Sequence, residues 1–298
     1  MKTENKMKTF KKISGLACMI GLLSLLATPA MSQEETESPA PVKEQKPVRT
    51  PFNSAVLVDN QTYVVMPKGQ FEFMIQHRFG TLKSESFDLF GLYAPSNIRL
   101  GLTYGLAKNL QVGIGTTKNN MLQDLNWKYK ILTQTRSNSM PFALTYYGNV
   151  QYDAREKSNF GVDSLYKGTH RLAFFNELIL GRKFSSKLTM QVSLRYAHYN
   201  QIDSVAFPKL EHSNFGLGVG GRFRFSPQGS VVFEYDQPLT TPDIIKPNIA
   251  VGFEIATSSH SFQIFITRYN GISPQKNMMF NTNQDFLLGF NITRNWNF

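Results

Sequence analysis

The chain ends with FLLGFNITRNWNF, residues 286–298, and this stretch decides the fold. Every second side chain in it is large and mostly apolar: Phe286, Leu288, Phe290, Ile292, Arg294, Trp296 and Phe298. Successive side chains of a β-strand point to opposite faces, so these residues share one face. A terminal strand with an aromatic face that closes on Phe is typical of a transmembrane β-barrel. Its last strand must pair with its first, because hydrocarbon tolerates no unpaired sheet edge.

The rest of the chain repeats this alternation. From Gln70 onward we predict about twelve strands with apolar residues at alternate positions. The links between them alternate between short ones (105–109, 133–139, 185–187, 226–229, 257–260) and mostly long ones (80–96, 151–169, 200–212, 237–246, 270–283). Membrane barrels have short periplasmic turns, long outer loops and an even number of strands. The predicted fold class is therefore all-β: an antiparallel transmembrane β-barrel of about twelve strands.

A soluble β-sandwich is the alternative, since its strands also alternate between an apolar and a polar face. The chain contains 24 Phe and 12 Tyr, while its mean hydropathy is only −0.26. The Phe-rich face is continuous enough to form a belt around a barrel, and Tyr and Trp tend to lie near strand ends, where interfacial girdles form. These features favour a face that contacts lipid over a shared core.

Residues 1–32 have the pattern of a cleaved secretory signal peptide: lysines, an apolar run from Ile13 to Ala27, then Ala30-Met31-Ser32. The run is short for a hydrocarbon core of roughly 30 Å, which argues against a membrane anchor. Cys18, the only cysteine, lies inside the run, which argues against lipidation and leaves the exported chain without thiols. We therefore expect export to the outer membrane of a Gram-negative cell.

Two segments separate the signal from the strands. Residues 33–51 (QEETESPAPVKEQKPVRTP) have almost nothing to bury and are predicted to be a disordered periplasmic linker. Residues 52–69 are more apolar, so this N-terminal segment is either an extra strand or a plug inserted into the barrel of residues 70–298.

The face opposite the apolar one is rich in charge. The residues that we predict to line the lumen are Arg78, Arg99, Lys128, Lys130, Arg171, Glu177, Arg195, Arg222, Arg224, Glu234 and Glu254. Glu72, Asp236 and Asp285 have the same phase, and cations slightly outnumber acids in the combined set. A water-filled lumen of this kind would favour anions.

Membrane lipid, including lipopolysaccharide, is the expected partner of the outer face. Arg268 and Arg294 fall on that face near strand ends, and we expect their guanidinium groups to reach lipid headgroups. The barrel-assembly machinery is expected to engage the C-terminal strand that ends at Phe298. The formal net charge of +11 includes no Lys/Arg run typical of nucleic-acid binding, so no nucleic-acid partner is predicted, and protein partners are not indicated.

Several motifs resemble an uncharacterised outer-membrane β-barrel family of Bacteroidota, the domain of unknown function 5777 family. They are Met66-Pro67-Lys68-Gly69, residues 75–80 (IQHRFG), 89–91 (LFG), 96–101 (SNIRLG), 218–222 (GVGGR) and 289–294 (GFNITR). The resemblance extends from about Val56 to the C-terminus. It implies the outer-membrane location and the barrel fold, and it brings no activity or site residues.

An outer-membrane hydrolase would need a nucleophile and a base that converge near the strand tops. His212-Ser213-Asn214 attracts attention, but neighbours in a strand point to opposite faces, so these three side chains cannot meet. His77, His170, His198 and His260 have no spacing typical of a metal site. We therefore predict no enzyme, no catalytic residues, no metal and no cofactor, and an outer-membrane lipid hydrolase is the least favoured function.

Two hypotheses remain for the function. In the first, the barrel is a passive pore for small solutes with a weak anion preference. In the second, opposite charges pair across a filled lumen and the barrel is a non-conducting structural or partner-binding scaffold. Glycines in the inner-face phase favour open space or an inserted segment: Gly101, Gly113, Gly115, Gly216, Gly218, Gly220, Gly252 and Gly289. Residues 52–69 would be that segment.

Overall fold

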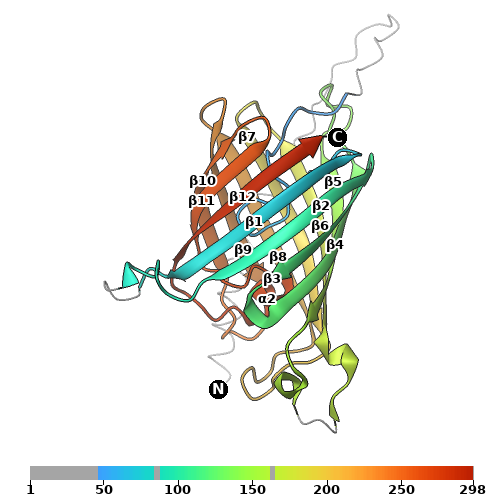
Figure 1. Cartoon of the computed structure of the whole chain (residues 1–298). Helices are drawn as coiled ribbons and strands as arrows, with labels where there is room; N and C mark the ends of the chain where they lie inside the picture. Colours follow the sequence, from blue (N-terminus) through green and yellow to red (C-terminus); the bar gives the residue numbers. More distant parts are fainter. Residues whose placement is uncertain (1–45, 84–87, 162–164, 298) are drawn as a thin grey trace, which may run out of the picture. The chain divides into compact units, whose positions relative to one another are not determined.

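Twelve antiparallel strands close into one barrel in the computed structural model, which describes residues 46–83, 88–161 and 165–297 (Figure 1). The strands are β1 (Gln70–Thr81), β2 (Asn97–Ala107), β3 (Leu110–Thr117), β4 (Leu122–Leu132), β5 (Ala143–Asp153), β6 (Leu172–Lys183), β7 (Leu188–Tyr199), β8 (Ser213–Arg224), β9 (Gly229–Pro238), β10 (Asn248–Ala256), β11 (His260–Thr267) and β12 (Leu287–Asn297). The predicted fold class is confirmed.

The barrel closes where the C-terminal stretch predicted. β12 pairs antiparallel with β1, from Phe71 opposite Trp296 to Arg78 opposite Gly289. This pairing removes the last free edges, so every strand has two hydrogen-bonded neighbours. The predicted signal peptide, Cys18 and Phe298 lie outside the described residues.

Side chains alternate between lipid and lumen along each strand. In β1, Phe71, Phe73 and Ile75 are partly exposed on the outer face, whereas Glu72 and Arg78 on the inner face are buried. Other outer side chains are more exposed: Ile114 and Phe253 are each 59 % accessible. Such large exposed apolar faces are stable only against another apolar medium, here lipid tails.

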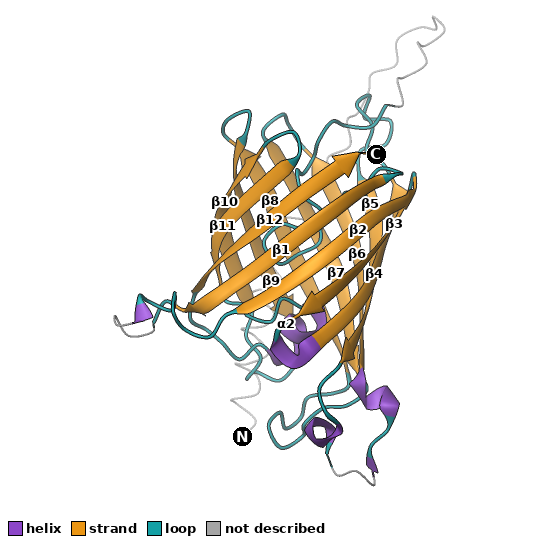
Figure 2. Ribbon diagram, in the orientation of Figure 1, coloured by secondary structure: helices purple, strands orange, loops and turns teal. Residues whose placement is uncertain are grey.

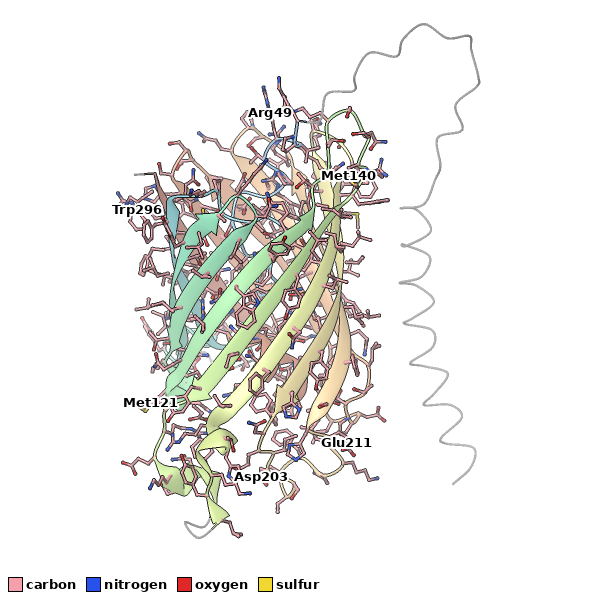
Figure 3. All side chains as sticks on the ribbon, turned by 90° about the vertical axis from the view of Figure 1, so that its right-hand side faces the viewer. Arg49, Met121, Met140, Asp203, Glu211 and Trp296 are labelled. Atoms are coloured by element: carbon pink, nitrogen blue, oxygen red, sulfur yellow. The ribbon has the colours of Figure 1, made fainter. Side chains whose placement is uncertain are left out.

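The short and long links lie at opposite ends of the barrel (Figure 2). Figure 3 labels Trp296 and Met140 at the short-link end, and Met121, Asp203 and Glu211 among the long links. We assign the short-link end to the periplasm, because bacterial barrels keep their longer loops outside. The long links carry the short helices η2 (Asn119–Met121), η3 (Lys157–Phe160), η5 (Gly168–Arg171) and α2 (Pro274–Phe280). Among the described residues, no helix has the length and apolar character needed to cross a membrane.

The described chain begins by crossing the periplasmic end of the barrel. The Val48 N–H donates to the Gln134 carbonyl over 3.1 Å, and Pro47 forms an isolated β-bridge with Thr135. Hydrogen bonds to the barrel thus begin before residue 52, within the last part of the predicted linker. Residues 33–45 of that linker lie outside the described residues.

Residues 52–66, which we call the plug, then fold as a loop inside the barrel and lead into β1. The loop turns where the Leu57 N–H donates to the Asn60 carbonyl over 2.8 Å. Leu57 and Val58 are 1 % and 0 % exposed, and Tyr63 is 4 % exposed. The plug contains no strand beyond the single bridge between Val56 and Gln61.

The helix α2 fills the lumen from the extracellular end. It begins at Pro274, after Ser273, whose Oγ accepts the Lys276 N–H. Gln275 donates to Asn149 of β5, and Ser273 donates to Gln151 of the same strand over 2.6 Å. Met278 and Met279 are buried with the plug in one hydrophobic cluster. The plug and α2 therefore meet within one packed interior.

Glycines in the wall make room for plug side chains, and this packing can be tested. A Cβ added at Gly181 would lie 1.9 Å from the Tyr63 ring, so Gly181→Ala must displace that ring. We expect the free energy of unfolding to fall by about 1–3 kcal/mol, as for other overpacked cores. The measurement is urea unfolding in lipid, followed by the fluorescence of Trp127 and Trp296.

Gly168→Ala is the matched control, because no heavy atom lies within 4 Å of a Cβ there. Adding Tyr63→Ala should remove most of the penalty of Gly181→Ala in a double-mutant cycle. Equal stability of the two single glycine variants would show that the plug does not occupy the position described.

Candidate functional site

Glu234 of β9 holds the tip of the plug. Its carboxylate accepts the backbone N–H groups of Val58 (3.3 Å), Asp59 (3.0 Å) and Asn60 (3.1 Å). These three groups lie in a tight turn and have no strand partner, so a buried carboxylate replaces the missing backbone acceptors. Glu234 is 2 % exposed, and the contact is therefore closed to water.

Arg78 of β1 binds a carbonyl group and a carboxylate group of the same turn. Its guanidinium forms an ion pair with Asp59 at 2.9 Å and donates to the Val58 carbonyl over 3.0 Å. Thr267 of β11 donates to the other Asp59 oxygen over 3.0 Å, and the Arg78 guanidinium lies 4.4 Å from the centre of the Phe265 ring. Both charges are almost fully buried, so losing either partner would leave an uncompensated charge.

Lys128 of β4 binds both limbs of the plug. Its ammonium donates to the carbonyls of Ala55 (2.7 Å), Thr62 (2.9 Å) and Val64 (3.3 Å). Three acceptors match the three protons of the ammonium group. Lys128 thereby ties together the descending and returning parts of the plug.

Amide side chains of the wall complete the docking of the plug backbone. Gln191 accepts from the Tyr63 N–H (3.2 Å) and donates to the Gln61 carbonyl (2.6 Å). Gln111 accepts from the Met66 N–H over 2.7 Å. The wall thus binds mainly main-chain groups of the plug, and many of its inner polar residues act as hydrogen-bond partners of the plug.

Apolar contacts add to this polar docking. Leu57 and Tyr63 project toward wall positions occupied by Gly220 and Gly181, where a Cβ would meet their side chains at 2.7 Å and 1.9 Å. They share a buried cluster with Phe52, Val58, Tyr147, Phe175, Ile179, Val232 and Phe265. The inner face is therefore a mixed surface shaped to this segment, and two neighbouring lumen cavities, next to the plug tip, measure only about 30 and 20 Å³.

The other inner charges pair along the wall. Arg99 binds Asp124 at 2.8 Å, and Arg195 binds Glu177 at 2.8 Å and also Asp236. Glycines in the wall leave space for the flat guanidinium groups, since a Cβ at Gly115 would meet Arg99 and a Cβ at Gly218 would meet Arg195. Asp124 is not among the lumen residues predicted from the sequence, although it lies on the same strand face as Asn126 and Lys128.

The remaining predicted lumen residues lie nearer the ends. Glu254 accepts from Asn53 of the plug over 2.7 Å, and Arg222 donates to the Thr50 carbonyl over 2.9 Å. Lys130 and Arg224 are partly exposed near the periplasmic turns. Arg171 is the last residue of η5, directly before β6 begins. There it donates to Tyr166 and to the Asp153 carbonyl, so it belongs to the extracellular loops and not to the inner wall.

The two predicted headgroup contacts lie on the outer face. Arg268 follows β11 with its guanidinium 4.9 Å from the centre of the Phe286 ring, and Arg294 of β12 is exposed, 5.1 Å from Trp296. Arg182, which the sequence analysis missed, lies between Phe142 and Phe184, 5.4 Å from each ring. Lipid contact by Arg268 and Arg294 stays a prediction.

The family comparison concerns the barrel together with its plug. The family described as "Membrane bound beta barrel domain (DUF5777)" matches residues 52–296. The chain belongs to this family. The matched region begins at Phe52, the first residue of the plug, so the plug is part of what defines a DUF5777 domain. No curated protein matches the chain.

Solved structures similar to this DUF5777 barrel include porins and an outer-membrane channel. The NanC porin is 7 % identical, with a TM-score of 0.49 over 75 % of this chain and 98 % of that one. An outer-membrane channel of Pseudomonas putida F1 is 13 % identical, with a TM-score of 0.48 over 78 % and 98 %. The KdgM porin in complex with disordered oligogalacturonate is 7 % identical, with a TM-score of 0.46 over 76 % and 98 %.

The role of Lys128 in this DUF5777 barrel can be tested with a neighbour on the same strand face. Lys128→Met removes the donor of three plug carbonyls and takes away one of the two cations near buried Glu72, the other being Arg99. We expect the free energy of unfolding to fall by about 3–5 kcal/mol. Lys130→Met, two residues further on and partly exposed, should cost less than about 1 kcal/mol. Urea unfolding in lipid gives both values, and equal losses would contradict the assignment.

Proposed function

We propose that this protein is an outer-membrane channel for small solutes, in a bacterium of the Bacteroidota type, that is closed at rest by its own plug. The docking of the plug backbone on Glu234, Arg78 and Lys128 carries the proposal. Each of these contacts is buried, and buried hydrogen bonds to charged groups contribute about 1.5–3 kcal/mol apiece. Spontaneous opening is therefore rare, and conduction requires displacement of the plug.

The chemistry of the wall supports a channel over a permanent scaffold. A barrel that never opened could replace buried ion pairs by apolar side chains with little or no loss of stability. Here the inner face keeps charged and amide groups, which would be hydrated once the plug moved. A non-conducting structural or partner-binding barrel is the alternative, and it differs in one respect: its plug never leaves.

The weak anion preference is proposed for the mouth and not for the middle of the lumen. Between the two ends, the wall cations are Arg78, Arg99, Lys128, Arg195 and Arg222. These five cations face six wall acids, so the middle of the lumen has no excess of cations: Glu72, Asp124, Glu177, Glu234, Asp236 and Glu254. Excess positive charge lies near the periplasmic turns, at Lys130 and Arg224, where an exposed charge attracts anions to the periplasmic mouth of the barrel.

A disulfide between plug and wall tests the proposal. Ser54 Oγ lies 3.2 Å from Thr293 Oγ1, so Ser54→Cys with Thr293→Cys brings two sulfur atoms close enough to bond with little movement. The sequence contains one cysteine, Cys18, within the predicted signal peptide. We expect the oxidised double variant to conduct no current in planar bilayers, and the reduced form to show the openings of the wild type.

Deletion of residues 52–66 is the complementary variant. It also removes the plug side chains that pack with Met278 and Met279, so α2 loses part of its support in the lumen, and the variant should conduct and raise antibiotic permeability. Ser54→Cys alone is the matched control and should not respond to oxidant. Silence of wild-type, reduced and plug-deleted proteins, each shown to be folded, would favour the non-conducting barrel. Conduction through the oxidised double variant would mean that the plug does not close the lumen.

A second candidate function rests on three side chains at the extracellular rim. Asn200 Nδ2 donates to the Thr169 carbonyl (2.7 Å), so its Oδ1 accepts from His198 Nε2 (3.0 Å). His198 Nδ1 is then free to accept the Ser213 hydroxyl proton over 2.8 Å. In the sequence, His212 is the histidine next to Ser213, but the histidine that meets Ser213 is His198 on the neighbouring strand β7.

This arrangement has the order nucleophile, base and orienting amide that ester hydrolysis uses. Ser213 Oγ would attack an ester carbonyl of a lipid, and His198 would pass the serine proton to the departing alcohol. Water would then release the acid and restore the hydroxyl. The channel proposal, which is non-enzymatic, has the larger number of contacts behind it.

A fluorophosphonate probe tests the hydrolase function. Ser213→Ala should abolish labelling, whereas Ser185→Ala, in an exposed periplasmic turn, should leave labelling unchanged. His198→Gln should slow labelling by about 10²-fold or more if His198 is the base. Absence of labelling in the wild type would remove this function and leave the channel proposal untouched.

A further inference from the structure

A cavity of about 660 Å³ lies between the extracellular loops and α2. Four links converge on it, contributing Asn120, Arg155, Phe160, Tyr199, Phe207 and Lys276 among other residues. Asp203, another lining residue, marks this region in Figure 3. The volume is that of a pocket for a small organic molecule. Its position matters because α2 also closes the outer end of the lumen.

The charges that line this cavity are unequally satisfied. Arg155 pairs with Asp153 at 2.7 Å, and Asp203 accepts the backbone N–H groups of two following residues. Arg171 donates to Tyr166 and to main-chain carbonyls, and no carboxylate lies within ion-pair distance of it among the described residues. The lining therefore carries a net positive charge.

Lys276 is the cation best placed to bind a ligand. Its ammonium donates to the Asn120 side-chain oxygen over 3.1 Å, a neutral acceptor, and the side chain is half-buried. Burial, together with nearby Arg155, lowers the pKa of Lys276 to about 8, with Asp153 opposing the shift. Within the part of the chain that the structure describes, this half-buried ammonium has no anionic partner within ion-pair distance, so it would gain stability from a bound anion.

Aromatic rings form the other part of the lining. Phe280 of α2 packs edge-on against Tyr199 and Phe207, with ring centres 4.7 and 5.0 Å apart. Phe160 lies across the cavity under the Arg171 guanidinium, at 4.7 Å. Flat apolar surfaces of this kind bind the face of a ring, which fixes the orientation of a ligand whose charge is on Lys276.

We propose that this cavity binds a small organic carboxylate carried on a ring with an apolar face, held through Lys276 and the Phe280 cluster. An aromatic acid and a sugar acid share this chemistry. The site deepens the proposed function, on which it rests in one respect: the ligand would be a solute of the channel that contacts α2 before entry. Binding itself does not require the channel to conduct.

Isothermal titration calorimetry on the full mature chain in detergent tests the proposal, with benzoate and glucuronate as probes. Benzamide and glucose are the neutral counterparts and should bind at least about tenfold more weakly. Lys276→Gln should weaken carboxylate binding by about tenfold or more, and Phe280→Ala by a similar factor. Lys246→Gln is the control, since the Lys246 ammonium donates to the Asp243 main-chain oxygen in another extracellular link.

The pH dependence gives a second readout that a structural role of Lys276 would not produce. Lys276 must be protonated to hold a carboxylate, so affinity should fall about tenfold from pH 7 to pH 9, as the ammonium with a pKa of about 8 loses its proton. Lys276→Gln should remove this fall. The other charged or titratable groups that line the cavity are Asp153, Arg155, His170, Arg171, Tyr199 and Asp203. Preference for benzoate or for glucuronate identifies the source of the ring.

Absence of saturable binding of either acid up to about 10 mM would overturn the proposal. So would equal effects of the Lys276→Gln and Lys246→Gln substitutions, or equal affinity for the acids and their neutral counterparts. These results are independent of the plug–wall disulfide experiment. Binding together with silence of the wild-type, reduced and plug-deleted proteins would therefore refute the channel and keep the site, whereas conductance without binding would do the reverse.

Discussion

The structure depends on the need of every backbone polar group for a partner in a setting without water. On the outer side, hydrocarbon forces the strands to pair with one another, and this closes the barrel between β1 and β12. The same requirement acts inside, where only some of the plug's backbone groups pair with one another. Side chains of the wall, above all Glu234 and Lys128, supply the missing donors and acceptors.

This double use of one rule explains why the inner face is so polar and yet so well packed. Charged residues of the kind that line a water-filled pore here bind main-chain groups of the plug or pair along the wall. Glycines such as Gly181 and Gly220 then remove the side chains that would prevent close approach. A lumen built in this way is a docking surface for one segment, so its polarity by itself does not make it an open pore.

The barrel interior is filled from both ends by segments of different character. The plug enters from the periplasmic side and is held chiefly through its backbone, by contacts from several strands of the wall. α2 is a short helix of seven residues within a long loop, anchored to β5 by Ser273 and Gln275. A ligand above α2 and a movement of the plug below it would therefore act on different closures of the same passage.

The sequence by itself determined the strands, their lipid-facing sides, the alternation of short and long links and the closure at the C-terminal strand. Each follows from a period of two or from link length, which are local properties. Only the tertiary structure decided which charges pair, that Arg171 lies among the loops, and that Ser213 of β8 meets His198 of the adjacent strand β7. It also decided how residues 52–66 lie, because that segment has no period of its own. Its conformation is set by acceptors and donors on distant strands, and no local pattern encodes such partners.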